Sequence, residues 1–493
     1  MSEKEPEMTE TPAKPASPEG GKSAASALNP SAAITDFGID TTSMSTGEAI
    51  GDYFSRLKAG QLGSLPALLG LLVLVIVFAS LSDTFLTMNN IANLMAQGAG
   101  KAIIAMGIVF VLLLGEIDLS AGTASGVTAA VLAMHYVRNG NLLGGMGNGV
   151  FITFLVVLAI AGLLGVILRI WAGVGFAVLA IVLVLSGAAA NPWIEIVLAI
   201  SVGGAIGVLT GFLVSKIGMP SFVVTLALFL AWQGVILQFI GEGGTLGIST
   251  SDVLFKVANG NLSTLGSWIL FVVAAGGFAA VSLGQHFSRL KRGLVTQPTP
   301  MVLFKVGAIA VVAAIATYLL TINRAPNPNI VISGVPYVVP IVLALLVLGT
   351  YVLNRTQYGR HIYAVGGNRE AARRAGINVE KIRASVFVIC SAVAAIGAIV
   401  YSSKVGSVDP QAGGLNTLLF AVGAAVIGGT SLFGGKGRVV DAVIGGLVLA
   451  VVENALGLLK QSAAVVNIVT GLVLLLAATV DALSRRRAAA SPR

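Results

Sequence analysis

Long apolar runs, repeated from Leu65 to residue 482, constrain this chain more than any other feature of its sequence. Each run has about 17–22 residues and can cross roughly 30 Å of hydrocarbon as an α-helix. Backbone groups in lipid must form hydrogen bonds within their own segment, so helices are the expected solution. We therefore predict an all-α polytopic transmembrane bundle of about 14 helices, within a range of 10–14, over residues 65–484. The runs are 65–81, 98–115, 119–136, 149–169, 170–189, 193–214, 220–240, 265–284, 301–321, 336–354, 384–404, 415–432, 439–458 and 464–482.

The composition excludes a soluble protein. Hydrophobic residues make up 56% of the chain and charged residues only 10%, whereas soluble domains carry about 25% charged residues. The single cysteine, Cys390, excludes a disulfide framework and a cysteine-based metal site. The three histidines, His135, His286 and His361, are far apart in sequence, and helical metal sites usually need paired ligands, so we expect no metal centre.

The basic residues predict the orientation of the bundle. With a cytoplasmic N-terminus and 14 crossings, 24 of the 30 Lys and Arg residues fall on the cytoplasmic side. This distribution agrees with the positive-inside rule and predicts that both termini are cytoplasmic. The six basic residues predicted to lie outside are Lys101, Arg138, Lys256, Arg324, Lys404 and Lys460.

The two ends of the chain differ from the apolar part. Residues 1–64 contain nine acidic and five basic residues, with several prolines and a Ser/Ala/Thr-rich stretch. This composition is typical of a solvated, mostly disordered segment, here a cytoplasmic tail. Residues 485–493 form a second cytoplasmic tail, which is basic.

Ionisable residues inside the apolar part are candidates for function because they are costly in a membrane. Most of them lie near predicted helix ends, where they can reach headgroup water. Glu116 and Asp118 mark a break between two helices, which is either a solvated turn or a discontinuity that lines a cavity. The adjacent residues Glu453 and Asn454 are more typical of a hydrogen-bonding site between helices than of a proton relay. The candidates are Glu116, Asp118, Glu195, Asp441 and Glu453.

The segment from Thr430 to Gly437 partly matches a phosphate-binding loop. It has the Gly-Lys pair, but it lacks the opening glycine, and Gly437 replaces the hydroxyl residue that binds magnesium. We therefore expect no nucleotide or other cofactor on this chain, and any ATP hydrolysis is expected in a partner subunit.

The cytoplasmic loop 355–383 is the most informative segment. It holds seven Lys or Arg residues against Glu370 and Glu380. Asn368 is a good N-cap and Gly376 a good stop, so we predict a helix of about seven residues, Arg369–Ala375, that projects into the cytoplasm. Its small residues Ala371, Ala372 and Ala375 could fit a shallow groove. The loop is either a positive-inside anchor that happens to fold or a docking element for a soluble partner.

Four segments, in order, resemble the monosaccharide ABC transporter permeases of the ribose, xylose and branched-chain amino acid type. The segment Tyr358–Ile377 resembles the cytoplasmic loop of that family. Residues 115–122 resemble its Gly-Gly-Ile-Asp-Leu-Ser-Val-Gly motif, with Glu116 and Ala121 as departures, and 219–226 resemble its Pro-Phe-Ile-Val-Thr-Leu segment. Residues 428–438 resemble its glycine-rich inner loop. The extra length at 1–64, 140–190 and 285–335 resembles the longer xylose-type permeases.

The resemblance implies a type II importer-like permease subunit in a bacterial cytoplasmic membrane, not an enzyme. It implies a homodimer with the sugar path between the copies, a separate ATPase subunit below and an extracytoplasmic sugar-binding protein above. The expected cargo is a monosaccharide, xylose or a similar pentose or hexose. The alternatives are an ion-coupled secondary sugar transporter and a membrane-embedded enzyme. The sequence lacks the paired catalytic carboxylates or the His-rich site that would favour an enzyme.

The resemblance also implies roles for residues in the matching motifs. Residues of the ATPase-coupling loop would be Gly359, Ala364, Gly366, Gly367, Asn368, Glu370, Ala371, Ala372, Gly376 and Ile377. A second inner contact would comprise Gly428, Gly429, Gly434, Gly435 and Arg438. Motif residues that could border the path are Gly115, Ile117, Asp118, Leu119, Ser120, Pro220, Thr225 and Asn454. The glycines Gly366, Gly367 and Gly376 would let the coupling loop turn at low steric cost.

Overall fold

The computed structural model describes residues 47–48, 51, 63–294, 296–325, 327 and 329–490. Nearly all of the predicted tail 1–64 and the last three residues of the predicted basic tail lie outside this part of the chain. Within it the fold is an all-α bundle, as the sequence predicts, with one two-stranded sheet in which β1 (Leu246–Gly247) pairs antiparallel with β2 (Ser407–Val408).

Each of the 14 predicted runs coincides with a helical segment. In the described part of the chain, 10 helices are long and apolar enough to cross a membrane. The other four are the shorter apolar helices α2, α7 and α18 and the less hydrophobic α4. The bounds are α2 Leu65–Leu81, α3 Met88–Leu113, α4 Ser120–Val137, α6 Asn148–Ile167, α7 Trp171–Leu185, α8 Pro192–Ser215, α9 Ser221–Ile240, α11 Thr264–Phe271 continued through a π-helical turn, η2 Val272–Gly276, to α12 Gly277–Lys291, α13 Thr299–Thr321, α14 Val338–Arg355, α17 Val379–Val405, α18 Leu415–Ile427, α19 Val439–Leu458 and α20 Ala463–Ala490.

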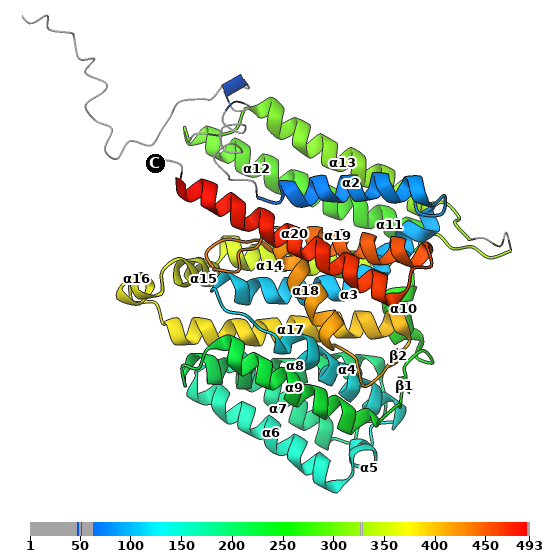
Figure 1. Ribbon diagram of the computed structural model, residues 1–493, viewed down its shortest axis with the longest axis vertical. Helices are drawn as coiled ribbons and strands as arrows, with labels where there is room; N and C mark the ends of the chain where they lie inside the picture. Colours follow the sequence, from blue (N-terminus) through cyan, green and yellow to red (C-terminus); the bar gives the residue numbers. More distant parts are fainter. Residues whose placement is uncertain are drawn as a thin grey trace, which may run out of the picture.

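The long helices lie side by side, and the short elements cluster at the two ends of the bundle (Figure 1). At one end project α15 (Gln357–Gly367) and α16 (Arg369–Arg374). At the opposite end lie α5 (Leu142–Met146), α10 (Asp252–Asn259) and the small sheet. Helix α2 begins and α20 ends on the same side as α16 (Figure 1). We call this side the inner end, following the predicted cytoplasmic position of the 355–383 loop.

Helices α3, α8 and α17 form the centre of the bundle. Small residues allow this packing, because a Cβ atom added to Gly203, Gly207 or Gly211 of α8 would lie 2.5–2.7 Å from a carbonyl oxygen of α17. Glycines four residues apart on one face of α8 therefore allow α17 to pack closely against it. Helix α3 is buried over almost its whole length.

The structure corrects three details of the sequence prediction. Helix α3 begins at Met88, ten residues before the predicted run 98–115, so Lys101 lies halfway along a helix and not near its outer end. The loop 355–383 contains α15 in addition to the predicted short helix. Helix α20 extends to Ala490, into the segment predicted to be a tail.

Candidate functional site

The predicted short helix of the inner loop is present, and its ends are formed as the sequence predicts. Helix α16 covers Arg369–Arg374, and the side chain of Asn368 accepts a hydrogen bond from the backbone N–H of Ala371 at 2.9 Å. Glu370 in the first turn forms ion pairs of 3.6 and 3.2 Å with Arg373 and Arg374. Gly376 follows the helix with φ +81°, a conformation that glycine adopts without strain.

One face of α16 is turned to the bundle and the other to solvent. Ala371 and Ala375 are exposed, but Ala372 is buried in the main hydrophobic core. The expectation that Ala372 faces a partner is therefore wrong, because this side chain anchors α16 to its own chain. Ile377 is partly buried against the same core.

Helix α15 connects α16 to the membrane-spanning part. The hydroxyl groups of Tyr358 on α15 and Ser385 on α17 form a hydrogen bond of 2.7 Å. Burial raises the pKa of Tyr358 to about 12, so the phenol is neutral at physiological pH. Gly359 is also required here, since a Cβ atom would lie 2.2 Å from the carbonyl oxygen of Leu353 at the end of α14.

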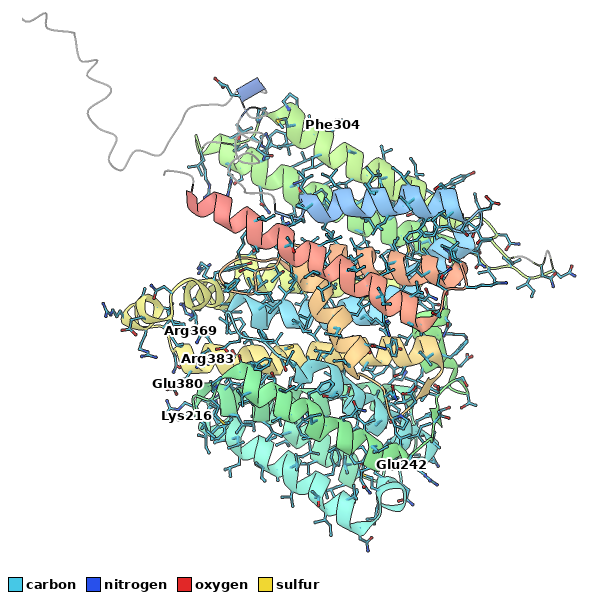
Figure 2. The ribbon with its side chains drawn as sticks, in the orientation of Figure 1. Lys216, Glu242, Phe304, Arg369, Glu380 and Arg383 are labelled. Atoms are coloured by element: carbon cyan, nitrogen blue, oxygen red, sulfur yellow. The ribbon has the colours of Figure 1, made fainter. Side chains whose placement is uncertain are left out.

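Glu116 ties α16 and α17 to the end of α3. Its side chain is 5% exposed and its Oε1 accepts from Arg369 at 2.8 Å and from Arg383 at 2.6 Å. Arg369 also donates to the carbonyl oxygen of Leu114 at 3.1 Å. Arg369 and Arg383 lie together at the inner end of the bundle (Figure 2). Of the two sequence interpretations of Glu116, a solvated turn is therefore wrong, because the carboxylate is buried in an ion-pair network.

The backbones of three segments contact one another at the inner end of the bundle. The N–H of Gly435 donates to the carbonyl oxygen of Leu113 at 2.8 Å. A Cβ atom at Gly366 would lie 1.8 Å from that same oxygen, and one at Gly434 2.8 Å from the N–H of Gly115. Gly115 and Gly434 have positive φ angles of +69° and +87°. We call the contact of residues 113–118, 357–377 and 428–438 the inner junction.

The glycines of the inner loop do not all act as the sequence suggests. Gly366 lies in the last turn of α15 and allows a close approach rather than a turn. Gly367 meets no described atom within 4 Å of an added Cβ. Ala364 and Gly367 are exposed, and so is Asn368.

The second inner loop is held by hydrogen bonds of its own. Asp441, in the first turn of α19, accepts from the backbone N–H of Arg438 at 2.8 Å and from its guanidinium at 3.0 Å. Tyr363 of α15 donates its hydroxyl to the carbonyl oxygen of Gly437 at 2.8 Å. A Cβ atom at Gly428 would lie 1.8 Å from the carbonyl oxygen of Asp441, and one at Gly429 would meet Gly63 at 3.0 Å.

The first and third sequence motifs meet at the break between α3 and α4. The N–H of Ile117 donates to Ser221 Oγ at 3.2 Å, and Thr225 Oγ1 donates to the carbonyl oxygen of Ile117 at 3.2 Å. Asp118 Oδ1 accepts from the N–H and hydroxyl of Ser120 at 3.0 and 2.6 Å. The side chains of Asp118, Ser120 and Thr225 are fully buried, so they do not border an open passage. Leu119 is half-buried and Pro220 exposed at the start of α9.

Asn454 has a structural role between helices. It donates to Asn90 and Gln97 of α3 at 3.0 Å each and accepts from Asn90 at 2.9 Å. This agrees with the interhelical hydrogen-bonding site predicted from the sequence. Its neighbour Glu453 forms an ion pair with Lys101 at 2.7 Å, which the sequence did not reveal because the two residues are 352 positions apart.

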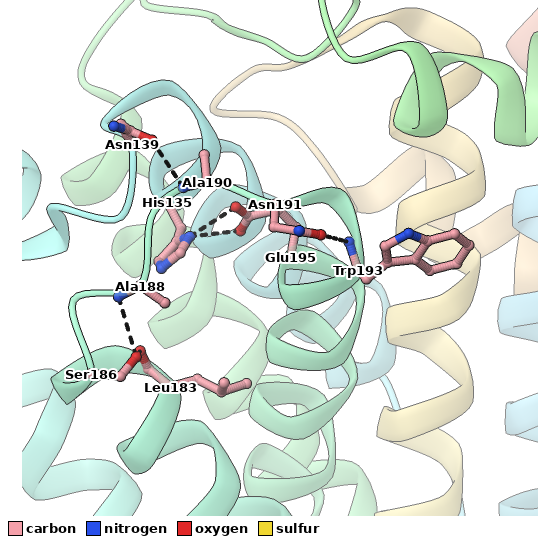
Figure 3. A network of polar contacts seen from close by, with 9 residues as sticks. All are labelled: His135, Asn139, Leu183, Ser186, Ala188, Ala190, Asn191, Trp193 and Glu195. Atoms are coloured by element: carbon pink, nitrogen blue, oxygen red, sulfur yellow. Dashed lines mark hydrogen bonds and ion pairs between the residues drawn. The ribbon is translucent and has the colours of Figure 1, made fainter.

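A fully buried pair is formed by His135 and Glu195 (Figure 3). Both side chains are fully buried, and His135 Nδ1 lies 2.9 Å from Oε1 and 2.8 Å from Oε2 of Glu195. Two asparagine side chains order the surrounding turns. Asn139 accepts a hydrogen bond from the backbone N–H of Ala190, and Asn191 accepts one from the backbone N–H of Trp193. The sequence predicts Glu195 near a helix end, and it lies in the first turn of α8, but no local pattern indicates His135 as its partner.

Comparisons with known proteins identify the family. Residues 170–478 match the family described as branched-chain amino acid transport system / permease component. The xylose transport system permease protein XylH of Haemophilus influenzae is 31% identical over 88% of this chain and 99% of its own length, and XylH of Escherichia coli K12 is 32% identical over 88% and 95%.

The ribose import permease protein RbsC of Escherichia coli K12 is 28% identical over 84% of this chain and 92% of its own length. No solved structure matches the chain. The family match covers more than half of the chain, and the relatives extend over nearly all of the apolar part. The chain belongs to the branched-chain amino acid transport system permease family, as a multi-pass membrane permease that is not itself an enzyme.

Proposed function

We propose that this chain is the membrane-spanning subunit of an ATP-driven importer for xylose or a closely similar monosaccharide. At the family level it is a sugar-type ABC importer permease, and such a permease implies a separate ATPase and an extracytoplasmic binding protein. The similarity to two XylH proteins over 88% of the chain supports xylose over ribose, for which the identity is lower. We further propose that two copies form a homodimer around the sugar path.

The observation that carries the proposal is the inner junction. Helix α16 projects from the bundle with a capped N-terminus, and its exposed face presents Glu370, Ala371 and Ala375. Behind it, Glu116 connects Arg369 to Arg383 on α17. A force applied to α16 by an ATPase would therefore reach α17 and the break at 114–119 through ion pairs and backbone contacts. This chain of contacts supports α15 and α16 as the coupling element.

Import by reconstituted vesicles tests the function. The permease is co-expressed and purified with the ATPase subunit of the same organism, placed in proteoliposomes that contain ATP, and supplied with the sugar-binding protein and radiolabelled xylose. We expect uptake that needs ATP and the ATPase and that persists with a protonophore. Ribose and glucose serve as competing sugars and rank the specificity. Uptake driven by an ion gradient without the ATPase, or no uptake of any monosaccharide, would contradict the proposal.

A further inference from the structure

A charged pair lies between α3 and α19 at a distance from the inner junction. Lys101 Nζ is 2.7 and 2.8 Å from the two carboxylate oxygens of Glu453. The ammonium group also lies 4.6 Å from the ring centre of Phe420 on α18 and 5.9 Å from that of Tyr401 on α17. Four helices thus converge on one cation.

The exposure of the pair is uneven. The Lys101 side chain is 9% exposed, but that of Glu453 is 43% exposed. Glu453 lies five residues before the end of α19, about 8 Å inside a membrane-spanning helix. Charged groups at such depth are costly against lipid and almost always face protein or a water-filled cavity. The open side of Glu453 therefore faces either a polar passage along this face of the bundle or a second protein surface.

A polar cavity of about 260 Å³ lies towards the end of the bundle opposite the inner junction, and it shares Tyr401 with the surroundings of Lys101. Tyr401 belongs to both features, and Thr417 of the cavity wall is three residues from Phe420 on α18, so both lie on one helix face. Polar side chains that line the cavity are Tyr401, Asp409, Gln411, Asn416 and Thr417. The volume is below the range of drug-sized sites and suits a single small ring.

We propose that Lys101, Tyr401, Asn416, Thr417 and Glu453 form a contact site for the hydroxyl groups of a neutral sugar that enters the permease. We call these residues the outer sugar site, and the inference rests on the proposed sugar-import function. The carboxylate of Glu453 accepts hydrogen bonds from hydroxyl groups, and the amide of Asn416 both donates and accepts. The aromatic ring of Tyr401 offers an apolar face with a polar tip. Because Lys101 neutralises Glu453, the site favours an uncharged polyol over an ion.

Two variants test the site, together with a matched control. Asn416→Ala removes an exposed amide that has no hydrogen-bond partner among the described residues, so it should leave the fold intact, whereas Glu453→Gln removes the charge but keeps the shape. Asn148→Ala changes an exposed asparagine at the start of α6, away from the cavity. The readouts are initial xylose uptake and the ATPase rate stimulated by sugar-loaded binding protein, in the reconstituted complex.

We expect Asn416→Ala and Glu453→Gln to lower uptake per ATP hydrolysed at least about fivefold, as the loss of one hydrogen bond to a passing sugar implies. The stimulated ATPase rate should be preserved, and Asn148→Ala should match the wild type. Wild-type uptake per ATP in both variants would overturn the site while leaving the import function standing. No sugar uptake by the wild type would instead overturn the proposed function, and the site with it.

Access from water gives an independent test. Asn416→Cys is made in a Cys390→Ala background, which removes the single native cysteine. We expect a membrane-impermeant maleimide, added to intact right-side-out vesicles, to label this cysteine. Absence of labelling in the membrane-embedded permease, both alone and in the assembled complex, would show that this face has no access from water, and it would overturn the polar passage.

Discussion

At the scale of single residues, Glu116 gives the inner end of the bundle its main electrostatic link. It stands where the resembling permease motif has a glycine, and it accepts from Arg369 and Arg383 on two different elements. A buried carboxylate needs such partners, because an isolated charge in the protein interior is strongly unfavourable. The residue therefore both stabilises the inner junction and connects α16 to α17.

Replacing Glu116 tests this link. Glu116→Ala leaves Arg383, which is 16% exposed, without its partner, and we expect a loss of roughly 3 kcal/mol in the free energy of unfolding. Differential scanning fluorimetry of the purified complex measures the stability, and co-purification measures ATPase binding. Glu380→Ala is the control, since Glu380 pairs with Lys216 on the exposed surface at 3.3 Å (Figure 2). Equal melting temperatures for the two variants would contradict the buried network.

Two adjacent glycines allow a matched experiment on packing. Gly366→Ala places a methyl group 1.8 Å from the carbonyl oxygen of Leu113, whereas Gly367→Ala meets no described atom within 4 Å. We expect Gly366→Ala to cost roughly 1–3 kcal/mol and to reduce xylose uptake, because α15 must move away from α3. Gly367→Ala should retain stability. Comparable behaviour of the two variants in melting and transport assays would rule out the close approach at Gly366.

At the scale of elements, α15 and α16 are short helices that depend on their ends and anchors. Helix α16 has six residues, too few for stability in isolation. Its cap by Asn368, its ion pairs and the burial of Ala372 hold it in place. Helix α15 is fixed to α17 by Tyr358.

The cap of α16 can be removed alone. Asn368→Ala should destabilise the helix by about 0.5–2 kcal/mol, because the N–H of Ala371 loses its acceptor. We expect faster hydrogen exchange over residues 369–375 and weaker ATPase co-purification. Asn368→Asp restores an acceptor at the positive helix start and should recover both. Unchanged exchange in Asn368→Ala would refute the contribution of the cap.

The anchor of α15 predicts a dependence on pH. Because burial raises the pKa of Tyr358 to about 12, the neutral phenol contributes its stability fully below pH 10. That contribution is lost as the pH rises towards 12. Tyr358→Phe should lower the melting temperature at neutral pH, through a loss of about 1 kcal/mol. Its stability should also fall less steeply than that of the wild type between pH 10 and 11, and parallel curves would contradict the assignment.

At the scale of the whole molecule, we predict that the two ends of the bundle face different compartments. We expect Ala375→Cys and Asp252→Cys, each made in a Cys390→Ala background, to label from opposite sides. An impermeant maleimide should reach residue 375, next to α16, in inverted vesicles and residue 252, on α10, in right-side-out vesicles. Labelling of both positions in one vesicle orientation would contradict the predicted topology and the cytoplasmic position of α16.

The sequence alone predicts those features that depend on residues close together in the chain. The apolar runs predict the 14 helical segments because a membrane requires long hydrophobic helices. Asn368 and Gly376 predict the limits of α16 because caps act within one turn. The spacing of glycines on α8 predicts close packing, though not that α17 is the neighbour.

Only the tertiary structure decided which distant residues meet. Glu116 and Arg383 are 267 positions apart, Lys101 and Glu453 are 352 apart, and His135 and Glu195 are 60 apart. No local pattern encodes such pairs, because they form only when whole helices pack and the charges left inside must find partners. The sequence by itself determined a membrane bundle with a capped inner helix. The packing of that bundle decided that the inner loops contact the break after α3 and that Lys101 of α3 pairs with Glu453 of α19.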